Sequence, residues 1–199
     1  MSSELDRPSY GEGREALMMA VVRLVARKGL RGATYRAVAA EAGVNHNLIN
    51  HHFGSIDALL DATTQWAVER SIANTQLGLF VEQDERFADA LIASVSTEPE
   101  LHLFQFEMIL EARRRPELRD ASSRLYGNYV SSVKQALETR GVEADDALCS
   151  AVFAALDGLM LQFLTVGNPS RIRSAVIQVG KLLSLAVEPH NGMATPRTA

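Results

Sequence analysis

A short segment near the start of the chain could read the edges of DNA bases. At about 100° per residue, one face of a predicted helix carries His46, Asn47, Asn50 and His51. The opposite face carries Leu48, Ile49 and Phe53. Amides and imidazoles hold both hydrogen-bond donors and acceptors, which base edges in a major groove require. The alternative is an ordinary short surface helix with one polar side.

Two further helix signals surround this segment and would position it. Thr34 is a helix N-cap for residues 34–42, and Gly43 tolerates the left-handed conformation that ends such a helix in a sharp turn. Asn45 is the predicted N-cap at the start of the polar helix, and Ser55 caps a third helix. This order predicts a helix-turn-helix, in which the second helix enters the major groove.

The same stretch follows a longer pattern of fixed spacings. A leading helix ends near a glycine and is followed by T-x-R-x-(I/V)-A-x-x-A-G-V, a polar helix, an aromatic residue and S-K-x-x-L-(L/F). To this pattern the chain contributes Gly29, Thr34, Arg36, Val38, Ala39, Ala42, Gly43, Val44, Phe53, Ser55, Leu59 and Leu60. From Arg14 through Leu60 the chain therefore resembles the N-terminal domain of TetR-family transcriptional regulators. The resemblance implies an all-α fold, with an N-terminal three-helix helix-turn-helix DNA-binding domain and a C-terminal helical ligand-binding and dimerisation domain.

Two residues depart from the family pattern. Asn50 stands where the family usually has a tyrosine, and Ile56 stands where it usually has a lysine. Both family residues commonly touch DNA, and losing the lysine should remove about one phosphate contact. His52 falls on a position that often contacts a phosphate, but its helical angle also suits a packed, neutral histidine. The predicted DNA contacts are Thr34, Tyr35, Arg36, Asn45, His46, Asn47, Asn50, His51 and His52.

Charge is unevenly distributed along the chain. The 199 residues carry a formal net charge of −4, but residues 1–53 carry +2 and three of the five histidines, whereas residues 54–199 carry −6. This asymmetry has the sign expected for a small DNA-contacting head on an acidic body. The run Arg113, Arg114 and Arg115 is expected to be a solvated helix end, favoured by the helix dipole, rather than an anion site.

Composition and motifs exclude several other classes of protein. The chain has no uncharged apolar run of about eighteen residues and no signal-peptide pattern, so a cytoplasmic protein without membrane contact is expected. The single cysteine, Cys149, excludes an intramolecular disulfide and a cysteine-cluster metal site. A phosphate-binding glycine loop, a G-x-S-x-G motif and histidine pairs at metal spacing are absent from the sequence, so no enzyme, no cofactor and no metal site is predicted.

The rest of the chain is a series of predicted helices separated by proline and glycine. A first helix covers about 12–28, and a connecting helix runs from Ser55 to about Leu79. Further helices are expected at about 85–96, 100–114, 117–140, 144–166 and 170–187. The predicted domains are residues 11–54 for DNA binding and 55–188 for effector binding and dimerisation, with flexible tails at 1–10 and 189–199.

The helix over residues 151–164 is apolar on more than one side and therefore needs two partners. In the resembled family the last two helices of each subunit form a four-helix dimer interface. Small residues that would allow such a close approach are Ala151, Ala154, Ala155 and Gly158. A homodimer also suits a pseudo-palindromic operator, whose half-sites lie about one helical turn apart. A monomeric bundle that buries this helix is the alternative.

Polar side chains among large apolar ones indicate where a ligand could bind. In the family an effector lies in a mainly apolar cavity framed by the fourth to eighth helices, where a few polar groups orient it. The predicted ligand-binding residues are Trp66, His102, Phe106, Glu107, Tyr126, Tyr129 and Asp157. For any one of them, core packing, solvent exposure or a helix cap is the alternative role.

The sequence therefore predicts a ligand-responsive transcriptional regulator. We expect a repressor that binds a double-stranded, pseudo-palindromic DNA operator as a homodimer and is released by a small, largely apolar effector. The alternative is a dimeric helical module of the same fold that binds a small molecule or a protein without recognising an operator. Asn50 and Ile56 are the residues that keep this alternative open.

Overall fold

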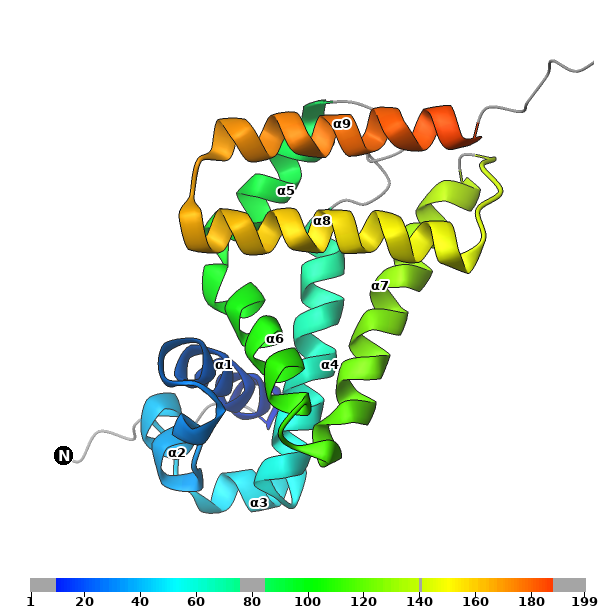
Figure 1. The fold of residues 1–199 in the computed structure, drawn as a ribbon. Coiled ribbons are helices and arrows are strands. Elements are labelled where there is room, and N and C mark those ends of the chain that lie inside the picture. Colours follow the sequence, from blue (N-terminus) through cyan, green and yellow to red (C-terminus); the bar gives the residue numbers. More distant parts are fainter. Residues whose placement is uncertain (1–9, 76–84, 140, 188–199) are drawn as a thin grey trace, which may run out of the picture. The chain divides into compact units, whose positions relative to one another are not determined.

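The computed structural model describes residues 10–75, 85–139 and 141–187. Over these residues the chain forms nine α-helices, two 3-10 helices and no strand (Figure 1). The predicted all-α class is therefore confirmed. The chain divides into two compact units, one made of Met1–Thr75 with Ala93–Tyr129 and the other of Gln76–Ile92 with Val130–Ala199.

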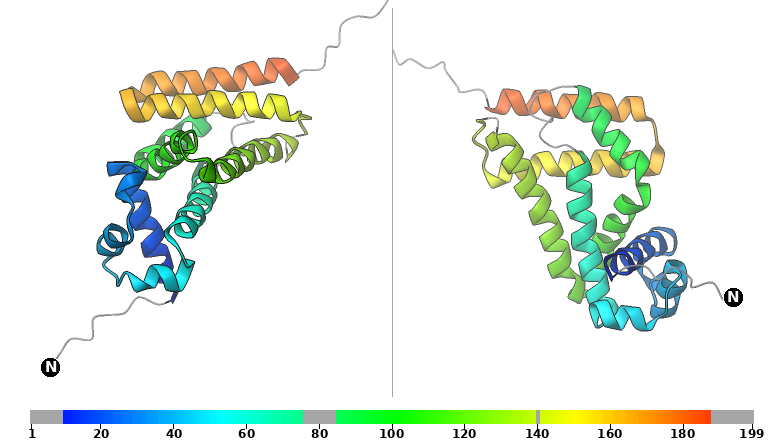
Figure 2. Two further views of the ribbon diagram at one scale, coloured as in Figure 1. Left: turned by 60° about the horizontal axis from the view of Figure 1, so that its bottom comes forward. Right: turned by 180° about the vertical axis from the view of Figure 1, so that it is seen from behind.

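The first unit contains the predicted helix-turn-helix and the helices that support it. Its elements are α1 (Tyr10–Lys28), η1 (Leu30–Gly32), α2 (Tyr35–Ala42), α3 (Asn47–Phe53), α4 (Ile56–Thr75), α6 (Pro99–Ala112) and η3 (Pro116–Leu118). It also holds the end of α5 (Glu85–Thr97) and the start of α7 (Arg119–Thr139). Figure 2 shows α1 lying across α2 and α3, with α4 continuing directly from α3.

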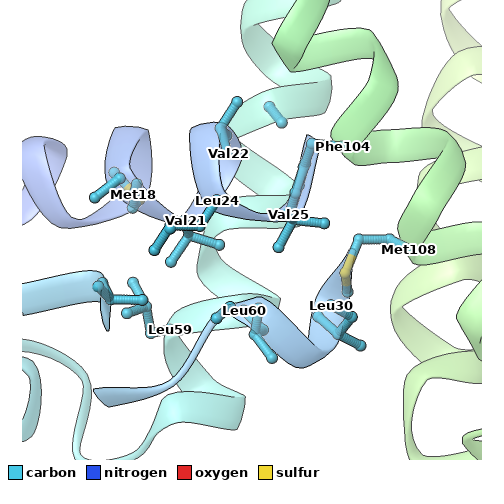
Figure 3. Close-up of a cluster of buried hydrophobic side chains, with 14 of the residues drawn as sticks. Met18, Val21, Val22, Leu24, Val25, Leu30, Leu59, Leu60, Phe104 and Met108 are labelled. Carbon is cyan, nitrogen blue, oxygen red and sulfur yellow. The ribbon is translucent and has the colours of Figure 1, made fainter. Parts of the chain in front are cut away.

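The core of the first unit forms around α1, because its apolar residues recur at helical spacing. Leu17, Val21 and Val25 have no exposed surface. Leu59 and Leu60 of α4 and Phe104 and Met108 of α6 complete the same cluster (Figure 3). Burying each of these side chains stabilises the fold by about 1.5–3 kcal/mol. The α2–α3 pair is thus seated on a core that α4 and α6 also share.

The observed helices follow the predicted ones closely, with differences at the ends. Tyr10 already belongs to α1, although the N-terminal tail was predicted to include it. The connecting helix begins at Ile56, directly after its predicted Ser55 cap, and is described as far as Thr75. Residues 76–79 of that predicted helix, the remaining N-terminal tail and the tail at 189–199 lie outside the described residues.

The second unit contains two long helices that lie side by side, α8 (Asp146–Val166) and α9 (Pro169–Val187). The Asp145 carboxylate caps α8 by accepting the N–H of Leu148 at 2.7 Å. Gly167 and Asn168 both have positive φ, 79° and 67°, and turn the chain into α9. Cys149 is buried in this unit, and burial raises the pKa of its thiol.

Some apolar side chains of α8 are exposed to solvent, because the second unit does not cover them. Leu161 is 42% exposed and Val166 is 82% exposed. Among the described residues, α8 is also the helix that is long and apolar enough, by length and composition alone, to cross a membrane. A helix that packs on more than one side in a water-soluble protein has the same composition.

Candidate nucleic-acid interface

Local hydrogen bonds fix the turn between α2 and α3. The Thr34 side chain accepts the N–H of Ala37 at 3.3 Å and caps α2 as predicted. Gly43 ends α2 in the left-handed conformation, with φ 67° and ψ 27°. The Asn45 side chain accepts the N–H of Asn47 at 2.9 Å. This local turn delays the next helix, so α3 begins at Asn47 and the predicted start at Asn45 is wrong by two residues.

The two faces of α3 differ in burial. Ile49 is fully buried, and Leu48 and Phe53 are half-buried against the core of the first unit. The predicted base-reading side chains are all exposed, namely His46, Asn47, Asn50 and His51. The apolar face therefore holds the helix in place, and the polar face is presented to solvent.

The beginnings of α2 and α4 lie together and are joined by a hydrogen bond. The Tyr35 hydroxyl oxygen accepts the backbone N–H of Ile56 at 2.9 Å. Ser55 caps α4 by accepting the N–H of Ala58 at 3.1 Å. Thr34, Tyr35 and Arg36 are exposed at the start of α2. Ile56, which replaces the family lysine, is half-buried and packs against the core cluster.

Ion pairs join α1 to α2. The same Glu41 carboxylate oxygen contacts Arg23 Nε and Arg27 Nη2, each at 2.8 Å. The hydrogen bond from Arg23, followed by that from Arg27, holds the pKa of Glu41 below its usual range. Because Glu41 lies in the last turn of α2, these contacts orient the helix that precedes the turn.

His52 is more enclosed than its neighbours on α3. Its ring lies edge-on to that of His51, with 5.1 Å between centroids, and a Cβ added at Gly13 of α1 would lie 3.5 Å from its Nε2. Burial, then the nearby His51 and Arg14, lowers the pKa of His52. These observations favour the packed, neutral histidine over a phosphate ligand. A contact between His52 and DNA stays a prediction.

Polar side chains of the body form a buried network between α4, α6 and α7. Gln105 of α6 is 6% exposed and donates to Ser71 Oγ of α4 at 2.8 Å. The Tyr129 hydroxyl of α7 donates to Gln105 Oε1 at 2.7 Å. Tyr129 was among the predicted ligand-binding residues, whereas Gln105 and Ser71 were not. The only sequence signal for Gln105 is a single amide within the apolar run LFQF.

His102 lies one turn before Gln105 on α6. It is 8% exposed, and its Nε2 is buried without a hydrogen-bond partner among the described residues. Burial lowers the pKa of His102 to about 4, against a smaller opposing effect of Glu98. The Glu98 carboxylate is itself bound by Arg70 Nη2 of α4 at 2.5 Å. His102 is therefore a neutral imidazole inside the body.

The other predicted ligand-binding residues lie in different surroundings. Trp66 packs against the core cluster of the first unit, with the Arg70 guanidinium 5.4 Å from its ring centre. The Glu107 carboxylate faces Gly29 just after α1. Phe106 is half-buried and Tyr126 is 39% exposed. Asp157 belongs to α8 in the second unit, where burial raises the pKa of its carboxyl to about 6.

A metal centre has no counterpart in the described part of the chain. Across residues 10–75, 85–139 and 141–187, no three His, Cys, Asp or Glu side chains gather closely enough to hold an ion. The interface built from α2, α3 and the start of α4 instead presents amides, imidazoles, hydroxyls and an arginine. These groups bind bases and phosphates by hydrogen bonding.

Comparison with known families divides the chain into two matching parts. Residues 17–63 match the family described as "Bacterial regulatory proteins, tetR family". Residues 82–181, half of the chain, match the family described as "Tetracyclin repressor-like, C-terminal domain". The first match covers the helix-turn-helix and residues 17–28 of the supporting α1.

Individual relatives resemble the chain over most of its length. The transcriptional regulator BetI of Burkholderia thailandensis is 26% identical over 187 residues, covering 88% of this chain and 94% of BetI. The nicotine-responsive repressor HdnoR of Paenarthrobacter nicotinovorans is 23% identical over 167 residues, covering 79% and 86% of the two chains. A crystal structure of a transcriptional regulator from Rhodococcus sp. Rha1 is 19% identical, covers 87% of this chain and 96% of its own, and has a TM-score of 0.68. The chain belongs to the TetR family of bacterial transcriptional regulators.

Proposed function

We propose that this chain is a repressor that binds a pseudo-palindromic operator as a homodimer and is released by a small, largely apolar effector. The observation that carries the proposal is the exposed polar face of α3, which a buried apolar face holds against the core. Members of the TetR family are DNA-binding regulators, and the relative HdnoR is described as a nicotine-responsive repressor.

Base recognition is assigned to α3 and backbone positioning to α2. Asn47 and Asn50 can each pair with the N6 and N7 edge of an adenine through one donor and one acceptor. Thr34, Tyr35 and Arg36 supply hydroxyl and guanidinium groups, which bind phosphates well but carry no sequence information. The exposure of all five side chains supports these roles.

Dimerisation is assigned to the exposed apolar surface of α8 and α9 in the second unit. On α8 this surface includes Leu161 and Val166, and on α9 it includes Leu182, which is 65% exposed. Ala151, Ala154 and Gly158 add small residues along α8, two of them exposed and Gly158 half-buried. A two-fold interface would bring this surface onto its own copy and give the protein the symmetry of a pseudo-palindrome.

The effector site is assigned to the buried polar residues of the first unit, His102 and the Gln105 network. His102 has an unsatisfied Nε2, and an unpaired buried polar atom costs about 1–3 kcal/mol. A ligand group that hydrogen-bonds to His102 would remove this cost, and the apolar remainder of the ligand would bury its surface. The other predicted residues, including Asp157 of the second unit, stay predictions.

Hydrogen bonds of the Gln105 network would couple such a ligand to the DNA-binding helices. Gln105 Nε2 donates to both Ser71 Oγ and the carbonyl oxygen of Ala67, so these hydrogen bonds join α6 to α4. The first residue of α4 is in turn held by Tyr35 of α2. A ligand that displaced Gln105 or Tyr129 would favour a different placement of α4. Its effect on DNA binding equals its difference in affinity for the two placements.

The decisive experiment is operator selection from random DNA, followed by a ligand screen for release and by reciprocal titration. The proposal expects effector and operator to weaken each other by the same factor, about 5–150-fold for a coupling of about 1–3 kcal/mol. Gln105→Leu should reduce this coupling, while Gln65→Leu, on the exposed side of α4, should leave it intact. A ligand that tightens operator binding would contradict release by the effector.

The second candidate is a dimeric module that binds a small molecule or protein without an operator. Asn50 and the half-buried Ile56 favour it, because both replace side chains with which the family commonly contacts DNA. A mobility-shift assay with the selected DNA and with the region upstream of the gene separates the two candidates. Absence of any sequence preference would favour the module and contradict the repressor.

A further inference from the structure

An arginine-lined cleft borders the start of α4. Its volume is about 470 Å³, and its floor includes Leu30, Ile56 and Leu60. Its rim carries Arg31 of η1 together with Arg114 and Arg115, which follow α6. All of these residues belong to the first unit.

The rim has an excess of positive charge that is available to an anion. Arg114 contacts Glu111 at 2.7 Å and Arg115 contacts Glu117 at 3.2 Å, and both arginines are exposed enough for water to screen these pairs. No described carboxylate lies within ion-pair distance of Arg31. The carboxylates of Asp57 and Glu111 also line the cleft, so its lining residues, which do not include Glu117, carry one net positive charge.

The basic character continues beyond the cleft. Arg113 and Arg119 are exposed on either side of η3, so residues 111–120 hold four arginines against the three carboxylates of Glu111, Glu117 and Asp120. The chain from residue 54 onward carries a net charge of −6. An arginine cluster in an otherwise acidic region is a local positive field, which attracts a polyanion.

The cleft also lies next to the segments proposed to contact DNA. Arg31 precedes Thr34 by three residues, and Ile56 follows Phe53, the last residue of α3, by three. Figure 1 shows the end of α6 and the start of α7 beside the beginning of α4. A duplex on the exposed face of α3 would therefore have backbone phosphates near this corner.

We propose that the cleft rim formed by Arg31, Arg114 and Arg115 binds the sugar-phosphate backbone of DNA, outside the bases that α3 reads. This inference rests on the proposed DNA-binding function. Guanidinium groups match phosphate oxygens in geometry, and phosphates would replace or share the carboxylates of Glu111 and Glu117 as their partners. A small organic anion on the apolar floor is the competing occupant. DNA is favoured because the cleft adjoins both DNA-contacting segments and because the arginine cluster extends past the cleft.

The test is the salt dependence of operator binding, measured by fluorescence anisotropy. Arg31→Ala, Arg114→Ala and Arg115→Ala are compared with the wild type on the selected operator and on an unrelated duplex. Each lost phosphate contact should reduce the slope of log affinity against log salt by about 0.9, hence by about 1.8 for a dimer. A slope of about 0.9 corresponds to a change in affinity of about eightfold per contact between 1 M and 0.1 M salt. The operator and the unrelated duplex should lose affinity alike, because phosphate contacts do not depend on sequence.

A matched control is Arg124→Ala, which removes an exposed arginine of the same unit that pairs with Asp61 on α4. Its slope should equal that of the wild type, and Arg114→Lys should restore most of the slope lost in Arg114→Ala. If the wild type binds the operator but all three rim variants keep its slope, the inference is wrong and the proposed function stands. Unchanged slopes together with altered binding of benzoate would identify a small-anion site instead. Failure of the wild type to bind DNA would overturn both proposals.

Discussion

The hydroxyl oxygen of Tyr35 accepts the backbone N–H of Ile56 at 2.9 Å, across 21 residues of sequence. These two residues are the first of α2 and the first of α4. The contact therefore closes a loop around the turn and α3. Since α3 has only seven residues, its orientation depends on such contacts as well as on the burial of Ile49.

Tyr35→Phe removes this hydrogen bond and keeps the aromatic ring. We expect a loss of about 0.5–1.5 kcal/mol in the free energy of unfolding, because a typical hydrogen bond contributes that much. Loss of the phosphate contact proposed for Tyr35 should weaken binding to operator and unrelated DNA alike. Operator affinity should fall further than that, since α2 and α4 would no longer fix the orientation of α3. Urea unfolding and operator titration of the same samples measure the two effects. Equal operator affinity in Tyr35→Phe and wild type would show that the contact does not orient α3.

Replacing Asn47 or Asn50 by alanine tests base recognition. Each substitution should cost about 1–3 kcal/mol on the selected operator, because one bidentate base contact is lost. Binding to unrelated DNA should be unaffected, because both side chains are assigned to bases rather than phosphates. Competition titrations with the two kinds of duplex provide the measurement. If both variants keep full operator affinity with an intact fold, the assignment of this face to the bases is wrong.

Leu161→Asp tests the proposed dimer surface on α8. Leu161 is 42% exposed in the chain alone, and the proposed interface would bury it in both subunits. Fully burying a leucine contributes about 1.5–3 kcal/mol, so covering the exposed 42% of Leu161 in both subunits contributes about 1–3 kcal/mol, and the two introduced carboxylates would weaken the dimer further. Sedimentation analysis over a range of concentrations measures the dissociation constant.

The matched control is Leu110→Asp, which places the same charge on α6 in the first unit, where Leu110 is 63% exposed. This control should dimerise like the wild type. A Leu161→Asp protein with the dissociation constant of the control would exclude Leu161 from the interface.

The sequence predicted the helix-turn-helix well because its signals are local. Thr34 and Gly43 act through their own side chain and backbone, and both behave as expected. The start of α3 was misplaced because the Asn45 side chain accepts the N–H of Asn47 in a local turn, and α3 begins only after that turn.

The interior of the body could be predicted only in part. Gln105 was missed because an amide in an apolar run reveals its role only when Ser71 and Tyr129, from other helices, come within reach. Glu107 lies on another face of α6, and its carboxylate is close to Gly29 instead. The partners in both cases are far apart in sequence, so helical periodicity identifies the face of α6 but not what that face meets.

His102 should make stability depend on pH in the acidic range. The pKa of its imidazole falls from an ordinary 6.5 to about 4 on folding, because burial disfavours the charged form. Between these values the unfolded chain binds a proton that the folded chain does not. Stability is therefore fully present above about pH 6.5 and is lost as the pH falls toward 4. The pKa difference corresponds to about 3 kcal/mol.

Asp157 acts in the opposite sense and must be separated from His102. The pKa of its carboxyl rises on folding from 3.8 to about 6, so the folded chain holds the extra proton and gains stability as the pH falls through this range. Urea unfolding from pH 4 to 8 should show a steeper acid loss for Asp157→Asn than for the wild type, and a shallower one for His102→Leu. Asp157→Asn should also be more stable than the wild type above pH 6. If His102→Leu shows the same acid loss as the wild type, the pKa of His102 is the same in the folded and the unfolded protein, and the burial that keeps the imidazole neutral below pH 6.5 is wrong.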